Sequence, residues 1–164
     1  MHSEAYEGFG WALRESGLYA EGPWKILDIG GQYVNGSVHD YFSNSFMTTL
    51  DLENADIIAD ATTWEPTELF DVVIATELFE HVQDWRAVIR TMAKALVPKG
   101  RFLATCASIG RRPHGVTGAL DPAPGEHYAN IHPDHLRDEI SKHFSQGHVR
   151  YEPNPGDAYM WAIR

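Results

Sequence analysis

Residues 70–103 read FDVVIATELFEHVQDWRAVIRTMAKALVPKGRFL, and this stretch carries the clearest signal of the fold class. Its first part, 70–76, is an apolar run rich in β-branched side chains, which predicts a buried strand. Asp84 is a suitable helix N-cap, and apolar residues follow it at helical spacing. A Pro-Lys-Gly turn at 98–100 ends that helix and leads into a second apolar run at 101–107. The stretch therefore predicts a strand, a crossover helix and a parallel second strand.

Similar short apolar runs lie on both sides of this unit. We expect a helix within residues 1–20, strands over 24–29, 46–52 and 57–61, a helix over 133–144, and a hairpin of strands over 147–152 and 157–163. Because strands and helices alternate, residues 1–164 should form one α/β domain. Its sheet should be doubly wound, mainly parallel and of the seven-stranded type, with a C-terminal antiparallel hairpin. Few residues separate the second and third strands, so the fold should be trimmed there.

Bulk composition narrows the class of protein. The chain has 164 residues, 43% of them hydrophobic and 22% charged, which is ordinary for a globular domain. No apolar run approaches the length that a membrane-spanning helix needs, and the first residues do not resemble a signal peptide. Cys106 is the only cysteine and lies in an apolar run, so we expect it to be a buried hydrophobe. These features favour a cytoplasmic protein.

Net charge argues against nucleic acid as a partner. The formal net charge is −10, from 13 basic and 23 acidic residues, whereas proteins that bind nucleic acid use clustered lysines and arginines to neutralise phosphates. Arg111 and Arg112 form the one adjacent basic pair, which we expect to be a solvated loop.

Acidic residues follow the first three predicted strands. Asp28 precedes Gly30-Gly31 at the end of the first strand, and a carboxylate there suits an ammonium group. Asp51 ends the second strand, where it could accept the two hydroxyls of a ribose, and Asp60 ends the third, where it could meet an adenine amino group. Each could instead cap the next turn. The G-x-G-x-x-G pattern of dinucleotide sites is absent, which disfavours a nicotinamide-dependent oxidoreductase.

These motifs resemble the class I S-adenosylmethionine-dependent methyltransferases, particularly the ubiquinone/menaquinone-type and related small-molecule branch. ILDIGGQYVNGS at 26–37 resembles the family's first motif, LDLENAD at 50–56 its ribose-binding strand end, and ADAT at 59–62 its adenine-side segment. The stretch 70–103 is similar to the central strand, Glu-His-Val turn, helix and Leu-x-Pro-x-Gly turn of that family. Two features depart from the pattern: the spacing of the third glycine, and the near absence of a helix between Asp51 and Asp60.

The resemblance implies S-adenosylmethionine as cofactor and S-adenosylhomocysteine as product. It also assigns residues to each part of the cofactor. The methionine part is expected at Asp28, Gly30 and Gly31, and its carboxylate at Asn35 or Ser37. The ribose is expected at Asp51 and Leu52, and the adenine at Asp60 and Ala61. Thr76 and Glu77 are expected to form the wall of the pocket.

Histidines are the candidates for a catalytic base. The segment 108–132 is a long loop without periodicity, as active-site lids often are, and it carries His114 and His127. His81 follows the central strand, where it is either a base near the cofactor or part of a helix start. His127, His132 and His135 could be read together as metal ligands, but no cysteine or paired carboxylate supports them. We therefore expect no metal site.

The acceptor is expected to be a small molecule, a saccharide or a lipid head group. Ala75-Thr76-Glu77-Leu78 stands where DNA amino-methyltransferases carry Asn/Asp-Pro-Pro-Tyr, and no Pro-Cys nucleophile is present. The acceptor pocket must come from the N-terminal helix, from the loop 108–132 or from a second subunit, so a homodimer is one expected arrangement. The alternative is a non-catalytic regulatory or scaffolding subunit that binds the cofactor. Small size and the missing helix motivate it.

Overall fold

The computed structural model describes residues 3–31 and 38–164. Its elements are, in chain order, α1 (Ser3–Glu15), β1 (Lys25–Ile29), η1 (Val38–Tyr41), β2 (Phe46–Asp51), β3 (Ile57–Ile58), β4 (Phe70–Thr76), η2 (Phe79–His81), α2 (Trp85–Ala95), β5 (Leu96–Ala107), α3 (Pro133–His143), β6 (Gln146–Glu152) and β7 (Asp157–Ile163). Seven strands form one sheet in the order β3-β2-β1-β4-β5-β7-β6. The first five pair in parallel, and β7 pairs antiparallel with both β5 and β6. The predicted fold class is confirmed.

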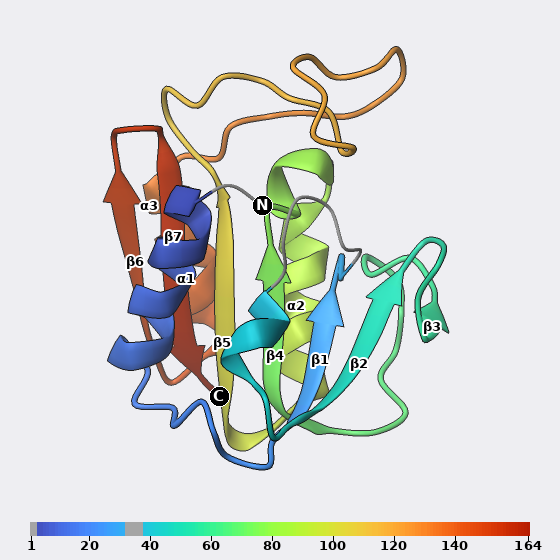
Figure 1. Ribbon diagram of the computed structural model, residues 1–164, viewed down its shortest axis with the longest axis vertical. Coiled ribbons are helices and arrows are strands. Elements are labelled where there is room, and N and C mark those ends of the chain that lie inside the picture. Colours follow the sequence, from blue (N-terminus) through green and yellow to red (C-terminus); the bar gives the residue numbers. More distant parts are fainter. Residues whose placement is uncertain (1–2, 32–37) are drawn as a thin grey trace.

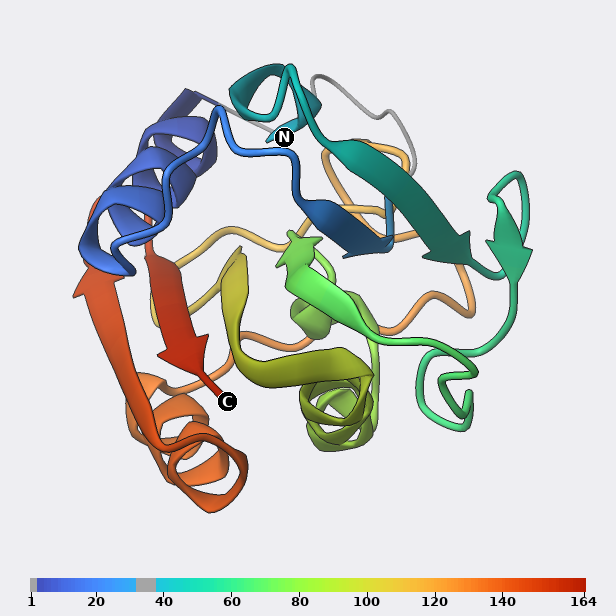
Figure 2. The same cartoon turned by 90° about the horizontal axis from the view of Figure 1, so that it is seen from below.

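Helices cover both faces of the sheet (Figures 1 and 2). On one face, α1 and η1 pack on one set of strand side chains, such as Ile26 and Val72. On the other face, α2 and α3 pack on the strand side chains that come next in sequence, Leu27 after Ile26 and Val73 after Val72. All four strand residues are fully buried, since successive side chains of a strand point to opposite faces. This two-sided burial explains why the central strands read as continuous apolar runs.

The predicted β–α–β unit around α2 is confirmed, with one change at its end. Asp84 caps α2 by accepting a hydrogen bond from the backbone N–H of Ala87 at 3.1 Å. Leu96 already pairs with Phe70, and the register then shifts before Arg101 meets Val72. The predicted Pro-Lys-Gly turn is therefore an irregularity inside a longer β5.

The sheet is trimmed beyond β2, as predicted. Residues 52–56, which connect β2 to β3, are all described by the structure and contain no helix. The predicted third strand over 57–61 was too long, because β3 ends at Ile58. The strand ends early because the side chain of Asp60 accepts hydrogen bonds from the backbone N–H and the hydroxyl of Thr62, which turns the chain out of the sheet.

Two smaller expectations have different outcomes. Cys106 is fully buried, as predicted. Arg111 does not belong to a solvated pair: its side chain is only 17% exposed and its guanidinium lies 3.6 Å from the buried carboxylate of Asp157, whereas Arg112 is exposed. Among residues 3–31 and 38–164, no helix has both the length and the apolar character needed to cross a membrane.

The contact between α1 and β7 yields a stability prediction. A Cβ atom built on Gly8 would lie 2.2 Å from the ring of Tyr159, whereas the nearest atom to one on Gly10 is the movable hydroxyl of Tyr41, at 2.6 Å. We expect Gly8→Ala to lower the free energy of unfolding by about 1–3 kcal/mol through overpacking, despite the better helix propensity of alanine. Gly10→Ala is the matched control and should cost less. Chemical denaturation measures both; a Gly8→Ala variant more stable than the parent would contradict this packing.

Candidate functional site

The candidate site lies at the carboxyl edge of the parallel strands. In Figure 1 the loop 108–132 passes over this edge. Its two ends are joined, because the hydroxyl of Ser108 donates to the carbonyl of Ile131 at 2.7 Å and the N–H of Ile131 donates to the carbonyl of Ala107 at 3.2 Å. The loop therefore starts and finishes at one point beside the strand ends.

The exit of β1 is a tight turn over a buried carboxyl group. Asp28 is only 3% exposed. Gly30 has φ +78 and donates its N–H to the carbonyl of Leu50 at 2.8 Å, a backbone conformation that favours glycine. A Cβ on Gly31 would lie 2.8 Å from Asp28 Oδ2, so a side chain there would press on the carboxylate. The two other residues assigned to this loop, Asn35 and Ser37, lie outside the described residues.

His39 is a partner of Asp28 that sequence reasoning missed. Its Nε2 lies 2.9 Å from Asp28 Oδ2, and this hydrogen bond raises the pKa of His39. Burial raises the pKa of Asp28, the hydrogen bond to His39 opposes that shift, and the charge of Asp51 adds to it. Asp28 and Asp51 are thus close enough to affect each other. No motif marks His39, since η1 places it there only in three dimensions.

The residues expected at the ribose and adenine lie along the outer strands. Asp51 is the last residue of β2 and is half-buried, and its Oδ1 accepts the N–H of Leu52 at 2.6 Å. Leu52 is 69% exposed. Asp60 is exposed and caps a turn, and its two hydrogen bonds from Thr62 lower its pKa. Ala61 follows it and packs at the margin of the core.

Glu77 follows Thr76 at the end of β4 in a strained conformation. Its φ is 53, which is uncommon for a residue other than glycine and is typical of functional sites. Hydrogen bonds to β5 hold it: its N–H donates to the carbonyl of Thr105 at 2.9 Å, and the Thr105 hydroxyl donates to its carboxylate at 3.1 Å. Leu78 comes next and packs near Gly30, so the exits of β1 and β4 face each other.

Glu80 is a fully buried acidic residue in η2. Its Oε1 accepts the N–H of Ala107 at 3.1 Å, and its carbonyl accepts the N–H of Ala129 at 2.8 Å. The η2 turn is thus tied both to β5 and to the long loop. Burial raises the pKa of Glu80 well above its usual value, and the nearby charge of Glu77 raises it further.

The long loop brings His114 and Tyr128 onto His81. The ring centroids of His81 and His114 are 5.1 Å apart, and Tyr128 lies 5.5 Å from the first and 5.0 Å from the second. Burial lowers the pKa of His81, and His114 lowers it further. Burial also raises the pKa of Tyr128. Of the three predicted bases, the structure joins His81 and His114, whereas the side chain of His127 is exposed.

Two further residues were not singled out from the sequence. Asp157, at the start of β7, is fully buried beside the same edge, and Arg111 lies against it. Glu80 was visible only as part of the Glu-His-Val turn. Burial of these acids depends on contacts between distant segments, so no local pattern signals it.

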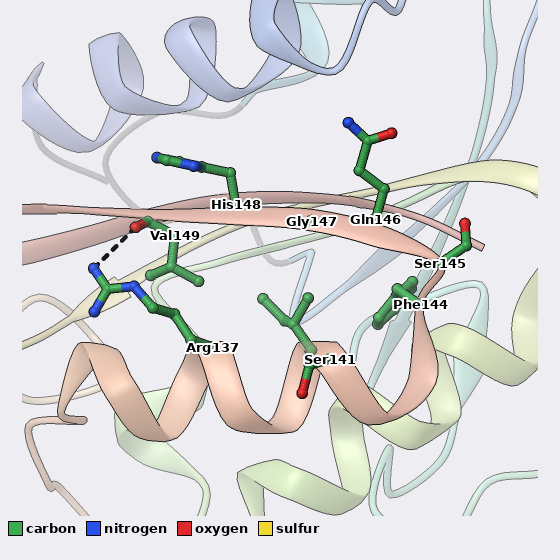
Figure 3. Close-up of a pocket in the computed structure, with 9 residues that line it drawn as sticks. Arg137, Ser141, Phe144, Ser145, Gln146, Gly147, His148 and Val149 are labelled. Carbon is green, nitrogen blue, oxygen red and sulfur yellow. Dashed lines mark hydrogen bonds between the residues drawn. The ribbon is translucent and has the colours of Figure 1, made fainter.

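A hollow elsewhere on the molecule does not belong to this site. It measures about 350 Å³ and is lined by the C-terminal part of α3 and the first residues of β6 (Figure 3). At one end of it, the guanidinium of Arg137 on α3 donates to the carbonyl of Val149 on β6 at 3.2 Å. Gln146 on β6 and Arg101 on β5 both pair with Ile163 of β7, which lies between them. The hollow therefore lies toward the amino end of the parallel strands.

A protein-family model described as a methyltransferase domain matches residues 12–143 of the chain. No curated protein matches it. Among solved structures, the 1,6-didemethyltoxoflavin-N1-methyltransferase of Burkholderia thailandensis, bound to 1,6-didemethyltoxoflavin and S-adenosylhomocysteine, superposes with a TM-score of 0.68 at 14% identity. That alignment covers 99% of this chain and 78% of the other.

Two further structures share the fold. Phosphoethanolamine N-methyltransferase 2 of Haemonchus contortus has a TM-score of 0.65 at 19% identity, over 90% of this chain and 39% of that one. An S-adenosylmethionine-dependent methyltransferase of Mesorhizobium loti has a TM-score of 0.62 at 17% identity, over 96% of this chain and 98% of the other.

The contact between Asp28 and His39 can be measured in solution. We expect the pKa of His39 to lie above the ordinary value of histidine, because the adjacent carboxylate favours the imidazolium. Asp28→Asn should lower it, since a neutral amide removes the charge. Titration of the histidine ring signals by NMR measures both, with the exposed His135 as internal control. An unchanged pKa of His39 in Asp28→Asn would contradict the contact.

Proposed function

The chain belongs to the methyltransferase domain family, and from this premise we propose that it transfers a methyl group from S-adenosylmethionine to a small molecule. The acceptor atom is a nitrogen or an oxygen of a small metabolite, a saccharide or a lipid head group. The observation that carries the proposal is the buried Asp28 under the Gly30-Gly31 turn, next to the half-buried Asp51 at the end of the neighbouring strand.

The donor would bind across the exits of β1, β2 and β4. At the turn of Gly30 the backbone carries no side chain that would block the methionine part of the cofactor. Asp51 would accept hydrogen bonds from the ribose hydroxyls. Asp60 and Ala61 would meet the adenine, with one oxygen of Asp60 already engaged by Thr62. We retain Asn35 and Ser37 as contacts of the cofactor carboxylate, with Thr76 and Glu77 as the wall toward β4.

The acceptor would bind between this edge and the long loop. Methyl transfer from a sulfonium is an in-line displacement, so the protein must align the acceptor atom with the methyl carbon and exclude water. The loop 108–132 carries His114 and Tyr128 to the site and is joined at both ends to the sheet, which suits it to cover a bound acceptor. If that acceptor is a hydroxyl, His81, His114 or His127 would accept its proton.

Several finer points belong to the same proposal. Residues 1–164 act as one domain, and a second subunit of a homodimer would contribute to the acceptor pocket. The similarity of residues 70–103 to the ubiquinone/menaquinone-type branch makes a small metabolite the first acceptor to test. The single buried cysteine agrees with a cytoplasmic location, and the net charge of −10 with an acceptor other than nucleic acid.

The ribose contact can be tested with one substitution. We expect Asp51→Ala to weaken S-adenosylmethionine binding by roughly tenfold to a hundredfold while the fold stays intact, because a charge-assisted hydrogen bond contributes about 1.5–3 kcal/mol. Calorimetric titration measures the affinity and circular dichroism the fold. Glu68→Ala removes an exposed carboxylate that pairs with Lys25 at the far end of the sheet, so it controls for the change in charge. Equal affinities for parent and Asp51→Ala would refute the assignment.

The acceptor side can be tested through turnover. With an acceptor found by screening for release of S-adenosylhomocysteine, we expect His114→Ala and His127→Ala to reduce turnover. Loss of a general base costs about a hundredfold or more, whereas cofactor affinity should change little. His135→Ala, on the exposed face of α3, is the control. If neither substitution slows the reaction, proton transfer does not involve the loop histidines. A chain that binds the cofactor and methylates no acceptor would instead be a regulatory subunit.

A further inference from the structure

We propose that Glu80, His81 and His114 form a binding site for a divalent transition-metal ion. One oxygen of Glu80 and one ring nitrogen of each histidine lie within 4.8 Å of one another. The three residues come from η2 and from the long loop, so the site exists only in the folded chain. Binding of the ion is independent of the methyl transfer proposed above, although its role in the reaction rests on that function.

The carboxylate of Glu80 has an unmet oxygen. Its side chain is fully buried, and while Oε1 accepts the N–H of Ala107, Oε2 has no hydrogen-bond partner among the residues that the structure describes. A buried carboxylate oxygen without a partner is costly, so buried acids are normally paired with a donor or coordinate a metal. The bond from Ala107 holds the group in place, and the unmet oxygen leaves the carboxylate able to bind a further partner.

His114 directs a ring nitrogen toward Glu80. Its Nδ1 lies 3.3 Å from the carbonyl oxygen of Arg112, and a carbonyl only accepts, so the ring proton is on Nδ1. The other nitrogen, Nε2, then carries a lone pair, and it lies 3.9 Å from Glu80 Oε1. Metal-binding histidines typically show this arrangement, in which a backbone carbonyl fixes the tautomer and the far nitrogen is the ligand.

His81 supplies the third atom. Its Nδ1 is buried and has no hydrogen-bond partner in residues 3–31 and 38–164, and its ring meets that of His114 nearly at right angles. A single proton would bridge two of these three groups and leave the third unmet. An ion that accepts lone pairs from all three satisfies them together, and the further negative charge of Glu77 nearby also favours a cation.

The ligand set indicates which ion binds. Two imidazole nitrogens and one carboxylate oxygen suit Zn²⁺, Fe²⁺, Co²⁺ or Ni²⁺ better than Mg²⁺ or Ca²⁺, which prefer oxygen ligands. Three protein ligands leave a coordination position for water or for an acceptor oxygen. With the ion bound, His81 and His114 would hold the metal in place of accepting a proton, and a metal-bound hydroxyl loses its proton more easily. From the sequence we expected no metal site, because the histidines considered as ligands were His127, His132 and His135, which no cysteine or paired carboxylate supports. Glu80 and His81 are adjacent, and His114 joins them only through the folded loop.

The test uses the tag-free full chain after treatment with a chelator. Zn²⁺ is titrated by calorimetry, and Co²⁺ is followed by visible absorption, which reports coordination by protein ligands. We expect one ion per chain, and affinity for Zn²⁺ at least about tenfold weaker in Glu80→Gln and in His114→Ala. His135→Ala controls for an exposed histidine and should bind as the parent does. His114 is on the loop, so its variant keeps the test decisive even if Glu80→Gln fails to fold.

Two results would overturn the site: no binding at one ion per chain, or a His114→Ala variant that binds Zn²⁺ as tightly as the parent. A parallel titration of the metal-free chain with S-adenosylmethionine keeps the two proposals separate. If that cofactor binds and Zn²⁺ does not, the metal site is wrong and the proposed methyltransferase stands. If Zn²⁺ binds at these residues but S-adenosylmethionine does not bind either with or without Zn²⁺, the metal site is supported and the proposed methyltransferase function is wrong.

Discussion

Parallel pairing of β1 with both β2 and β4 is the constraint on which the rest of the molecule depends. It buries both faces of β1 and β4, and it makes the three strands end at one edge of the sheet. Side chains that follow the strands therefore meet there, although they are far apart in the chain. As a consequence, the charge of Asp51 contributes to the raised pKa of Asp28.

The two cores stabilise a site that is locally unfavourable. Glu77 is held at φ 53, and Glu80 is buried with one oxygen that finds no partner in the described part of the chain. Each of these features costs free energy, which the packed layers on both faces of the sheet offset. The strained Glu77 and the buried acids Asp28, Glu80 and Asp157 all lie at the carboxyl edge, where the long loop passes over the strands. This is the distribution expected of a binding site rather than of a purely structural domain.

Local patterns were enough to predict most of the fold. The apolar run of β4, the cap at Asp84 and the alternation of strands and helices each have a short-range physical cause. The third strand was predicted, but its end was placed too late, because one side chain, Asp60, turns the chain out of the sheet after Ile58. In the site, the position of the carboxylates Asp28 and Asp51 could be predicted, because parallel strands end at the same edge of the sheet. The contacts of His39 with Asp28 and of His114 with His81 did not, because they depend on how η1 and the long loop fold back.

The central claim is that the carboxyl edge of this sheet binds S-adenosylmethionine. Its most direct test is calorimetric titration of the purified chain with S-adenosylmethionine, S-adenosylhomocysteine and NAD in parallel. We expect both adenosyl-sulfur ligands to bind, in the micromolar range, and NAD not to bind. Binding of NAD alone, or of none of the three, would contradict this claim.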